Sequence, residues 1–119
     1  MSGSVLRVLV DDVRVFRDGR PAHVVQTSSE ALALLDTLGG RFIDELWLDH
    51  DLVGDDTVQP VIDRLTTLAA AGTPLPVGRI LVHSANIREG HRITTELQAV
   101  GYPARRSFVA GMWRHAWTR

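Results

Sequence analysis

The chain has 119 residues, of which 45% are hydrophobic and 23% are charged, and its net charge is −1. These values fit one domain over residues 1–119 and argue against nonspecific binding to nucleic acid or to a membrane surface. Cysteine is absent, which excludes disulfides and thiolate metal sites. The longest early apolar stretch, Val5 to Val10, is too short for a signal peptide core or a membrane span, so we expect a cytoplasmic protein.

Short apolar runs alternate with segments of helical periodicity along the chain. The runs are typical of strands buried on both faces, and they cover residues 5–10, 23–26, 46–48 and 80–82. Apolar residues at helical spacing predict helices over about 31–38, 58–69 and 89–100. Ser28 or Ser29 is the expected N-cap of the first helix, and Asp56 or Thr57 that of the second. This alternation predicts an α/β fold with a mostly parallel sheet of four to five strands.

Both ends of the chain depart from this alternation. The segment 11–22 shows no helical stripe and contains the turn signals Asp18-Gly19 and Pro21, so the first crossover helix is expected to be shortened or missing. Near the other end we expect an edge strand over 106–109 and then a short helix. That helix would carry Met112, Trp113, Ala116 and Trp117. Its two tryptophans, four residues apart, suggest core packing or a homodimer contact.

Polar clusters follow three of the predicted strands. They are Asp11-Asp12, Asp49-His50-Asp51 and His83-Ser84-Ala85-Asn86. Because the carboxyl ends of parallel strands meet at one edge of a sheet, where ligands bind, these side chains are expected to line one pocket.

Carboxylates dominate this predicted pocket. Asp11, Asp12 and Asp49 offer the oxygen ligands that Mg²⁺ or Mn²⁺ takes in proteins. If the third strand stays extended through residue 51, Asp49 and Asp51 lie on one side and His50 on the other. Carboxylates this close repel each other unless a cation neutralises them, so the pattern favours a metal.

The same motifs resemble a known family. An acidic pair after the first strand, an aspartate after the third and a serine after the fourth are similar to the receiver domains of response regulators. More specifically, DDVR, LDHDLVGDDT and HSAN resemble the cyclic-phosphate processing receiver domain. This resemblance implies a flavodoxin-like, receiver-like three-layer sandwich and covers most of the chain.

The resemblance also implies roles for individual residues. Asp11 and Asp12 match the pair that holds a divalent cation in receivers, Asp49 matches the phosphoacceptor, and Ser84 matches the hydroxyl residue that contacts the phosphoryl group. The lysine that receivers place after their fifth strand has no match, because all thirteen basic residues are arginine. Arg14, Arg105 or Arg106 would have to supply that positive charge.

We therefore predict metal-dependent hydrolysis of a cyclic phosphate or related phosphate ester. The candidate catalytic residues are Asp49, His50, Asp51, His83 and Ser84, and the candidate phosphate-binding residues are Arg14, Ser84 and Asn86. Either histidine, or Asp51, would act as acid or base. The expected partner is a small phosphorylated ligand such as a nucleotide or an RNA end, with no membrane contact.

Each of these features also has a structural reading. Asn86 would serve equally as a helix cap, Arg14 as an ion-pair partner of the acidic pair, and His83 as a packed core residue. Two other functions stay open for the chain as a whole. One is an atypical receiver phosphorylated on Asp49, and the other is a noncatalytic module that binds a nucleotide or a protein.

Overall fold

The computed structural model describes residues 4–109 and 111–116 of the chain. Its elements, in chain order, are β1 (Arg7–Val10), β2 (Arg14–Phe16), β3 (His23–Val25), α1 (Ser28–Leu38), β4 (Ile43–Leu48), α2 (Gln59–Ala70), β5 (Val77–Val82), α3 (Ile87–Ala99), β6 (Ala104–Arg106) and β7 (Trp113–His115). The four predicted strands and the three predicted helices are confirmed, with shifted ends. Within the described residues, no helix has the length and apolar character that crossing a membrane requires.

A five-stranded sheet forms the centre of the fold. Its strands run in the order β3-β1-β4-β5-β6, and every neighbouring pair is parallel. Taken by chain position within the sheet, this is the strand order of flavodoxin-like proteins. The direction of strand addition reverses at β1, so the switch point lies where β1 and β4 end. Ligands bind at this crevice in open α/β sheets.

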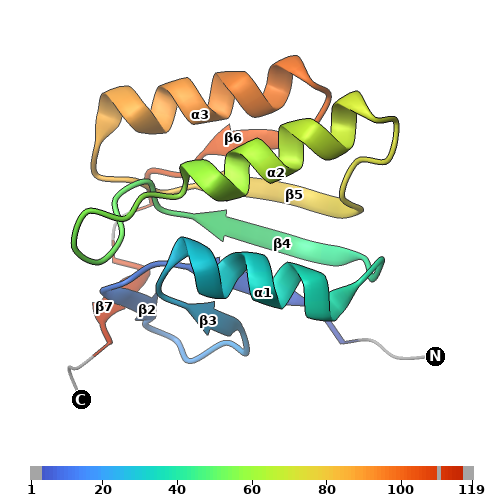
Figure 1. The fold of residues 1–119 in the computed structure, drawn as a ribbon. Helices are drawn as coiled ribbons and strands as arrows, with labels where there is room; N and C mark the ends of the chain where they lie inside the picture. Colours follow the sequence, from blue (N-terminus) through green and yellow to red (C-terminus); the bar gives the residue numbers. More distant parts are fainter. Residues whose placement is uncertain (1–3, 110, 117–119) are drawn as a thin grey trace.

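All three helices pack on one face of this sheet, with α2 between α1 and α3 (Figure 1). The core beneath them is built from aliphatic side chains of the strands and of the inward helical stripes, including Val8, Val10, Leu46, Leu48, Ile80, Val82, Leu35, Ile62, Leu65, Ile93 and Leu97. Burying each such side chain stabilises the fold by about 1.5 to 3 kcal/mol. This core holds the strand ends, and therefore the residues that follow them, in place.

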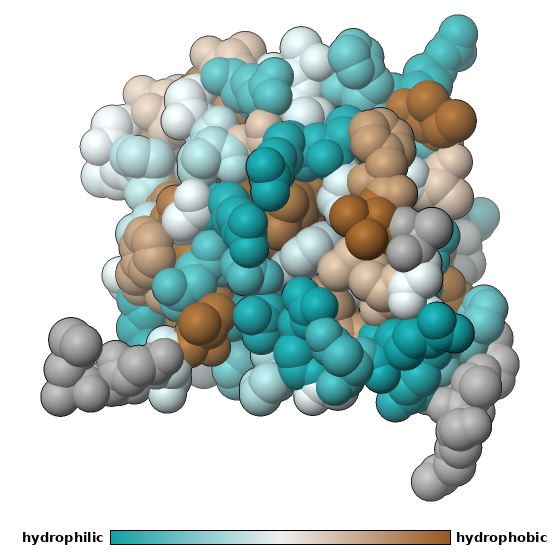
Figure 2. Space-filling model, turned by 180° about the vertical axis from the view of Figure 1, so that it is seen from behind, coloured by the Kyte–Doolittle hydropathy of each residue, from teal (hydrophilic) through white to brown (hydrophobic). Residues whose placement is uncertain are grey.

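A two-stranded ribbon covers part of the other face. There β2 and β7 pair antiparallel, with Phe16 opposite Trp113, and they pack on a smaller cluster that contains Leu9, Trp47 and Leu81. Figure 2 shows this face of the molecule. The α/β, receiver-like class is confirmed, and its third layer is this ribbon instead of helices. The first crossover carries β2 and no helix, as predicted.

The C-terminal part of the chain corrects two predictions. The last sheet strand is β6 at 104–106, so it ends where an edge strand over 106–109 was expected to begin. The predicted helix at the end is wrong, because residues 113–115 form β7. Met112 and Trp113 do pack on the sheet, but as part of a strand whose partner, β2, lies almost a hundred residues earlier. Trp117 lies outside the described residues.

The helix caps also differ from the prediction. Thr27 is the N-cap of α1, where its side chain accepts a hydrogen bond from the Glu30 N–H, so the cap lies one residue before Ser28. Helix α2 begins after Val58 and has no side-chain cap. Asp56 instead accepts hydrogen bonds from the Ser28 N–H and Oγ, at 2.7 and 2.6 Å. It therefore ties the loop after β4 to the start of α1.

Candidate active site

Three carboxylates gather where β1 and β4 end. One oxygen each of Asp11, Asp12 and Asp49 lies within 4.8 Å of the others. The parallel register of the two strands brings them together, because Val10 pairs with Leu48 and the Asp49 N–H donates to the Val10 carbonyl at 3.0 Å. The sequence predicted this set, and the sheet places it at the switch point.

Asp11 is fixed by hydrogen bonds to both of its oxygens. Its Oδ1 accepts from the N–H groups of Val13 and Arg14, each at 2.8 Å, and its Oδ2 lies 2.8 Å from Nε2 of His83. Burial raises the pKa of this carboxyl, but the hydrogen bonds from His83, Val13 and Arg14 more than offset that effect, so the net pKa is lowered. The charged form of Asp11 is therefore favoured, and hydrogen bonds orient both of its oxygens.

The pKa values of Asp49 and Asp12 are raised, in contrast to that of Asp11. Burial and the charge of Asp11 raise the pKa of Asp49 to about 6, although His83, Arg14 and a hydrogen bond from Ser84 act against this. Burial and the charges of Asp11 and Asp51 likewise raise the pKa of Asp12. The site thus holds more negative charge than its surroundings neutralise, as expected of carboxylates arranged for a cation.

His83 lies behind the carboxylates. Its side chain is 1% exposed, and its ring stacks on Trp113 with centroids 4.5 Å apart. Nε2 contacts Asp11, while Nδ1 is buried and has no hydrogen-bond partner among the described residues. The contact to a carboxylate implies that the proton sits on Nε2. His83 therefore orients Asp11, and it is enclosed by aromatic rings instead of facing a ligand.

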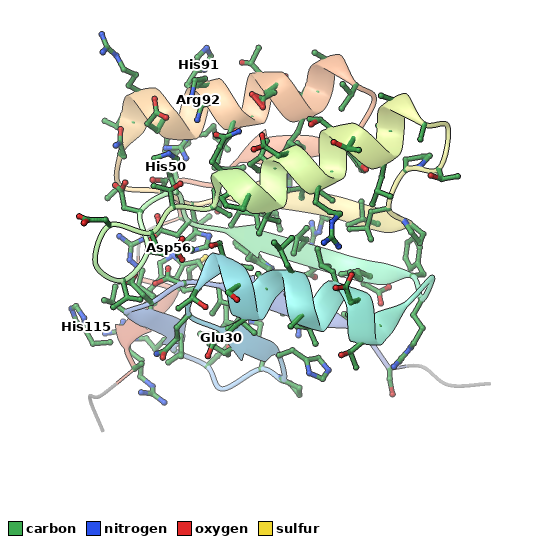
Figure 3. All side chains as sticks on the ribbon, viewed as in Figure 1. Glu30, His50, Asp56, His91, Arg92 and His115 are labelled. Carbon is green, nitrogen blue, oxygen red and sulfur yellow. The ribbon has the colours of Figure 1, made fainter. Side chains whose placement is uncertain are left out.

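His50 faces the helix side of the sheet. Strand β4 ends at Leu48, so the chain is not extended through residue 51 as the predicted alternation required. The His50 ring lies between two carboxylates, with Nδ1 at 2.8 Å from Asp51 and Nε2 at 3.2 Å from Glu89 of α3. Figure 3 shows His50 at the end of the sheet, below α3. It joins the loop after β4 to this helix.

Asn86 and Asp51 form the rim of the site. The Asn86 side chain caps α3 by accepting from the Glu89 N–H at 3.2 Å, and its Nδ2 lies 3.5 Å from Asp51. The structure thus confirms the capping role of Asn86. Asp51 is exposed, and its charge acts on Asp12. Asp51 is therefore open to solvent and close to the acidic cluster.

Two arginines and a serine flank Asp49. Arg14 donates to the His83 carbonyl at 3.0 Å, while Arg106 donates to the carbonyls of Val82 and Ser84, each at 3.0 Å. The charge of Asp49 acts on Arg106, and the positive charge of Arg14 acts on Asp49. These side chains place two guanidinium groups and one hydroxyl beside three carboxylates.

Of the three possible sources of charge, Arg14, Arg105 and Arg106, the structure places Arg14 and Arg106 near Asp49. Arg106 ends the fifth strand of the parallel sheet, the place after which receivers carry their lysine. Gly90 makes room for it, since a Cβ on this residue would lie 2.6 Å from Cζ of Arg106. A glycine inside the helical pattern of residues 89–100 was the available sequence signal.

The parallel sheet and the acidic cluster at its switch point define a receiver-like α/β domain. The model of one family, described as the cyclic-phosphate processing receiver domain, matches residues 6–99, and the chain belongs to this family. Comparisons with curated proteins and with solved structures gave no match. The family match ends before β6, so Arg106 and β7 lie beyond it.

Proposed function

We propose that the domain hydrolyses a cyclic phosphate or related phosphate ester with the help of Mg²⁺ or Mn²⁺. The observation that carries this proposal is the gathering of Asp11, Asp12 and Asp49, with one oxygen of each within 4.8 Å of the others. Membership of a cyclic-phosphate processing family supports the substrate class.

The donor set fits a hard divalent cation. All three side chains offer carboxylate oxygens, and Mg²⁺ is commonly held by one or two carboxylates together with substrate phosphate. Burial and the charge of Asp11 raise the pKa of Asp49 to about 6, so a nearby cation would favour its charged form. When bound, the cation would offset this charge and polarise the phosphate oxygens.

The flanking side chains fit the phosphate group. Arg14 and Arg106 bring positive charge near Asp49, where they would stabilise the charge that builds up on phosphoryl oxygens. The Ser84 hydroxyl, hydrogen-bonded to Asp49, offers a third polar contact. These groups are fixed by backbone hydrogen bonds, so they need little rearrangement to act.

Asp51 is the residue we assign as the general base. Hydrolysis adds water to phosphorus and breaks one ester P–O bond, and the proton that water loses is passed to the leaving oxygen. Asp51 is exposed at the rim and is oriented by His50, whereas His83 is enclosed behind Asp11. His50 and His83 are thus positioning residues in this proposal.

One observation favours a second function, a receiver phosphorylated on Asp49. Arg106 stands at the end of the last parallel strand, so its guanidinium takes the place of the receiver lysine beside Asp49. A receiver uses that positive charge to hold the acyl phosphate. This function predicts a protein-bound phosphate and no turnover of cyclic esters.

Phosphorus NMR separates these functions. The protein would be incubated with Mg²⁺ or Mn²⁺ and, in parallel, with nucleoside 2′,3′-cyclic phosphates, 3′,5′-cyclic nucleotides and acetyl phosphate. We expect a cyclic phosphate to be opened by the wild type and by Asp55→Asn, a control in the exposed loop, but not by Asp49→Asn. An acyl phosphate formed only from acetyl phosphate would establish the receiver instead. If the protein reacts with none of these compounds, our proposal is contradicted, and a noncatalytic binding module is the remaining function.

A further inference from the structure

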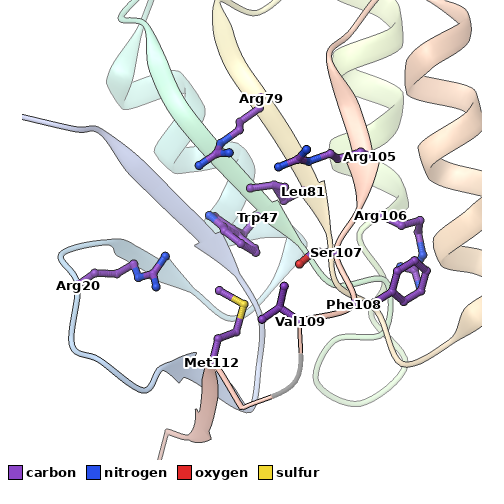
Figure 4. Close-up of a pocket in the computed structure, with 10 residues that line it drawn as sticks. All are labelled: Arg20, Trp47, Arg79, Leu81, Arg105, Arg106, Ser107, Phe108, Val109 and Met112. Atoms are coloured by element: carbon purple, nitrogen blue, oxygen red, sulfur yellow. The ribbon is translucent and has the colours of Figure 1, made fainter.

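A second cavity lies on the sheet face that carries no helix. It has a volume of about 290 Å³ and is lined by the ends of β4, β5 and β6 and by the segment that leads to β7. Figure 4 shows its arginines around a centre formed by Trp47 and Leu81. Six of its ten lining residues lie beyond the residues that match the family, namely Arg105, Arg106, Ser107, Phe108, Val109 and Met112.

Arginine dominates the lining of this cavity. Four of its ten residues are arginines, and none is acidic. Among the described residues, the guanidinium of Arg105 has no hydrogen-bond or ion-pair partner. Arg79 shares Glu45 with another arginine, and its side chain is 49% exposed. The cavity therefore carries more positive charge than its neighbours balance, and it suits an anion.

The remaining wall is apolar. Trp47 and Leu81 form a buried floor, while Phe108 and Val109 are 73% and 62% exposed at the edge. Figure 2 shows hydrophilic side chains on this face around a hollow with apolar surface inside it. An inorganic anion makes no use of apolar walls, whereas an organic phosphate does. The volume lies near the lower limit for ligand pockets, which favours a small molecule over a chain segment.

We propose that this cavity binds a nucleoside phosphate. Arg79 and Arg105 would hold the phosphate, and the base or sugar would lie against Val109 and Met112, which Figure 4 shows side by side. The cavity shares Arg106 with the acidic site, but none of Asp11, Asp12 and Asp49 lines it. Trp47 and Asp49 are two residues apart in the chain, a step of about 7 Å along a strand. Trp113 and His83 pack between the two sites. Because guanidinium groups need no cation to bind phosphate, this inference does not depend on the proposed hydrolysis.

Calorimetric titration of the full chain in EDTA tests the proposal, since removal of divalent cations keeps phosphate away from the acidic cluster. The probes are AMP, ADP, adenosine and inorganic phosphate. We expect AMP and ADP to bind at least tenfold more tightly than adenosine or phosphate. Arg105→Gln and Arg79→Gln should each weaken ADP about tenfold, the effect of losing one hydrogen bond to a charged group.

One control variant locates the binding. Arg41→Gln, at the other end of the sheet, should leave the affinity for ADP unchanged. Circular dichroism would check that every variant folds, and Arg105 is exposed, so its replacement should be tolerated. The Nε–H signals of the arginines in nitrogen-15 NMR spectra should shift with ADP for Arg79 and Arg105.

Three results would overturn the inference. They are the absence of binding by both nucleotides, equal affinity for ADP and inorganic phosphate, and unchanged affinity in both arginine variants. A shift of the Nε–H signal of Arg14, without shifts for Arg79 and Arg105, would move the ligand to the acidic site and would also contradict the proposal. None of these results bears on whether the protein opens a cyclic phosphate when Mg²⁺ is present.

Discussion

Replacing Asp49 with asparagine should stabilise the metal-free protein. The folded carboxyl has a pKa of about 6, against an ordinary value of 3.8, because burial and Asp11 disfavour its charged form. At a pH where the Asp49 carboxyl is charged in both the folded and the unfolded protein, its burial therefore lowers the free energy of unfolding. This shift of about 2 units corresponds to at most about 3 kcal/mol, and we expect a gain of about 2 kcal/mol. For a domain of this size, that is roughly 8 °C in Tm.

The sign of the pH dependence is fixed by the same shift. A carboxyl whose folded pKa is raised binds its proton more tightly in the folded state, so its favourable contribution is complete below pH 3.8 and is lost as the pH rises through about 6. The asparagine side chain is uncharged at every pH in this range, so it makes no such contribution to the pH dependence. Thermal unfolding in EDTA should therefore show a gain for Asp49→Asn at pH 8 that fades by pH 4, and no gain for Asp55→Asn. Equal gains at both pH values, or a loss at pH 8, would refute the electrostatic argument.

Three further substitutions test other contacts. His83→Ala should lower the free energy of unfolding by about 3 kcal/mol, measured in urea, because it leaves the buried charge of Asp11 without its partner; an unchanged urea midpoint would show that His83 does not support Asp11. Gly90→Ala should push Arg106 from its place and reduce cyclic phosphate turnover about a hundredfold, with stability changed by no more than about 1 kcal/mol; phosphorus NMR would follow the rate, and wild-type turnover would contradict the assigned role. Tyr102→Phe should cost about 2 kcal/mol in urea unfolding, since its buried hydroxyl donates to a carbonyl of α2 and accepts from the N–H that precedes β5; a cost near zero would mean that water replaces these bonds.

The sequence predicted the parts of the site that depend on local pattern. A branched-aliphatic run followed at once by an acid marks the carboxyl end of a buried strand, and this rule located Asp11 and Asp49. The rule that parallel strands end at one edge then brought them together. Neither step needs knowledge of the neighbouring side chains, so both could be made from the residues alone.

The sequence did not predict the contacts of His50, the strand β7 or the place of Arg106. These features depend on where strands end and on contacts between residues that are distant in the chain. The contact of His50 with Glu89 of α3 was not predicted, because it depends on how this helix packs beside the end of β4 at Leu48. Strand β7 was mistaken for a helix because apolar residues four apart fit both patterns over so short a segment. Its partner β2 is remote in the chain, and periodicity carries no signal for such pairing. The place of Arg106 likewise needed the helix α3 beside it.

The ribbon and the acidic site are parts of one structure. One oxygen of Asp11 accepts the N–H groups of Val13 and Arg14, and so forms the turn that begins β2. Strand β7 pairs with β2 and carries Trp113 onto the ring of His83, which in turn holds the other oxygen of Asp11. Each oxygen of this carboxylate is therefore fixed through the helix-free face. Receivers carry a helix in their first crossover, whereas here the ribbon occupies that face and orients Asp11 from behind.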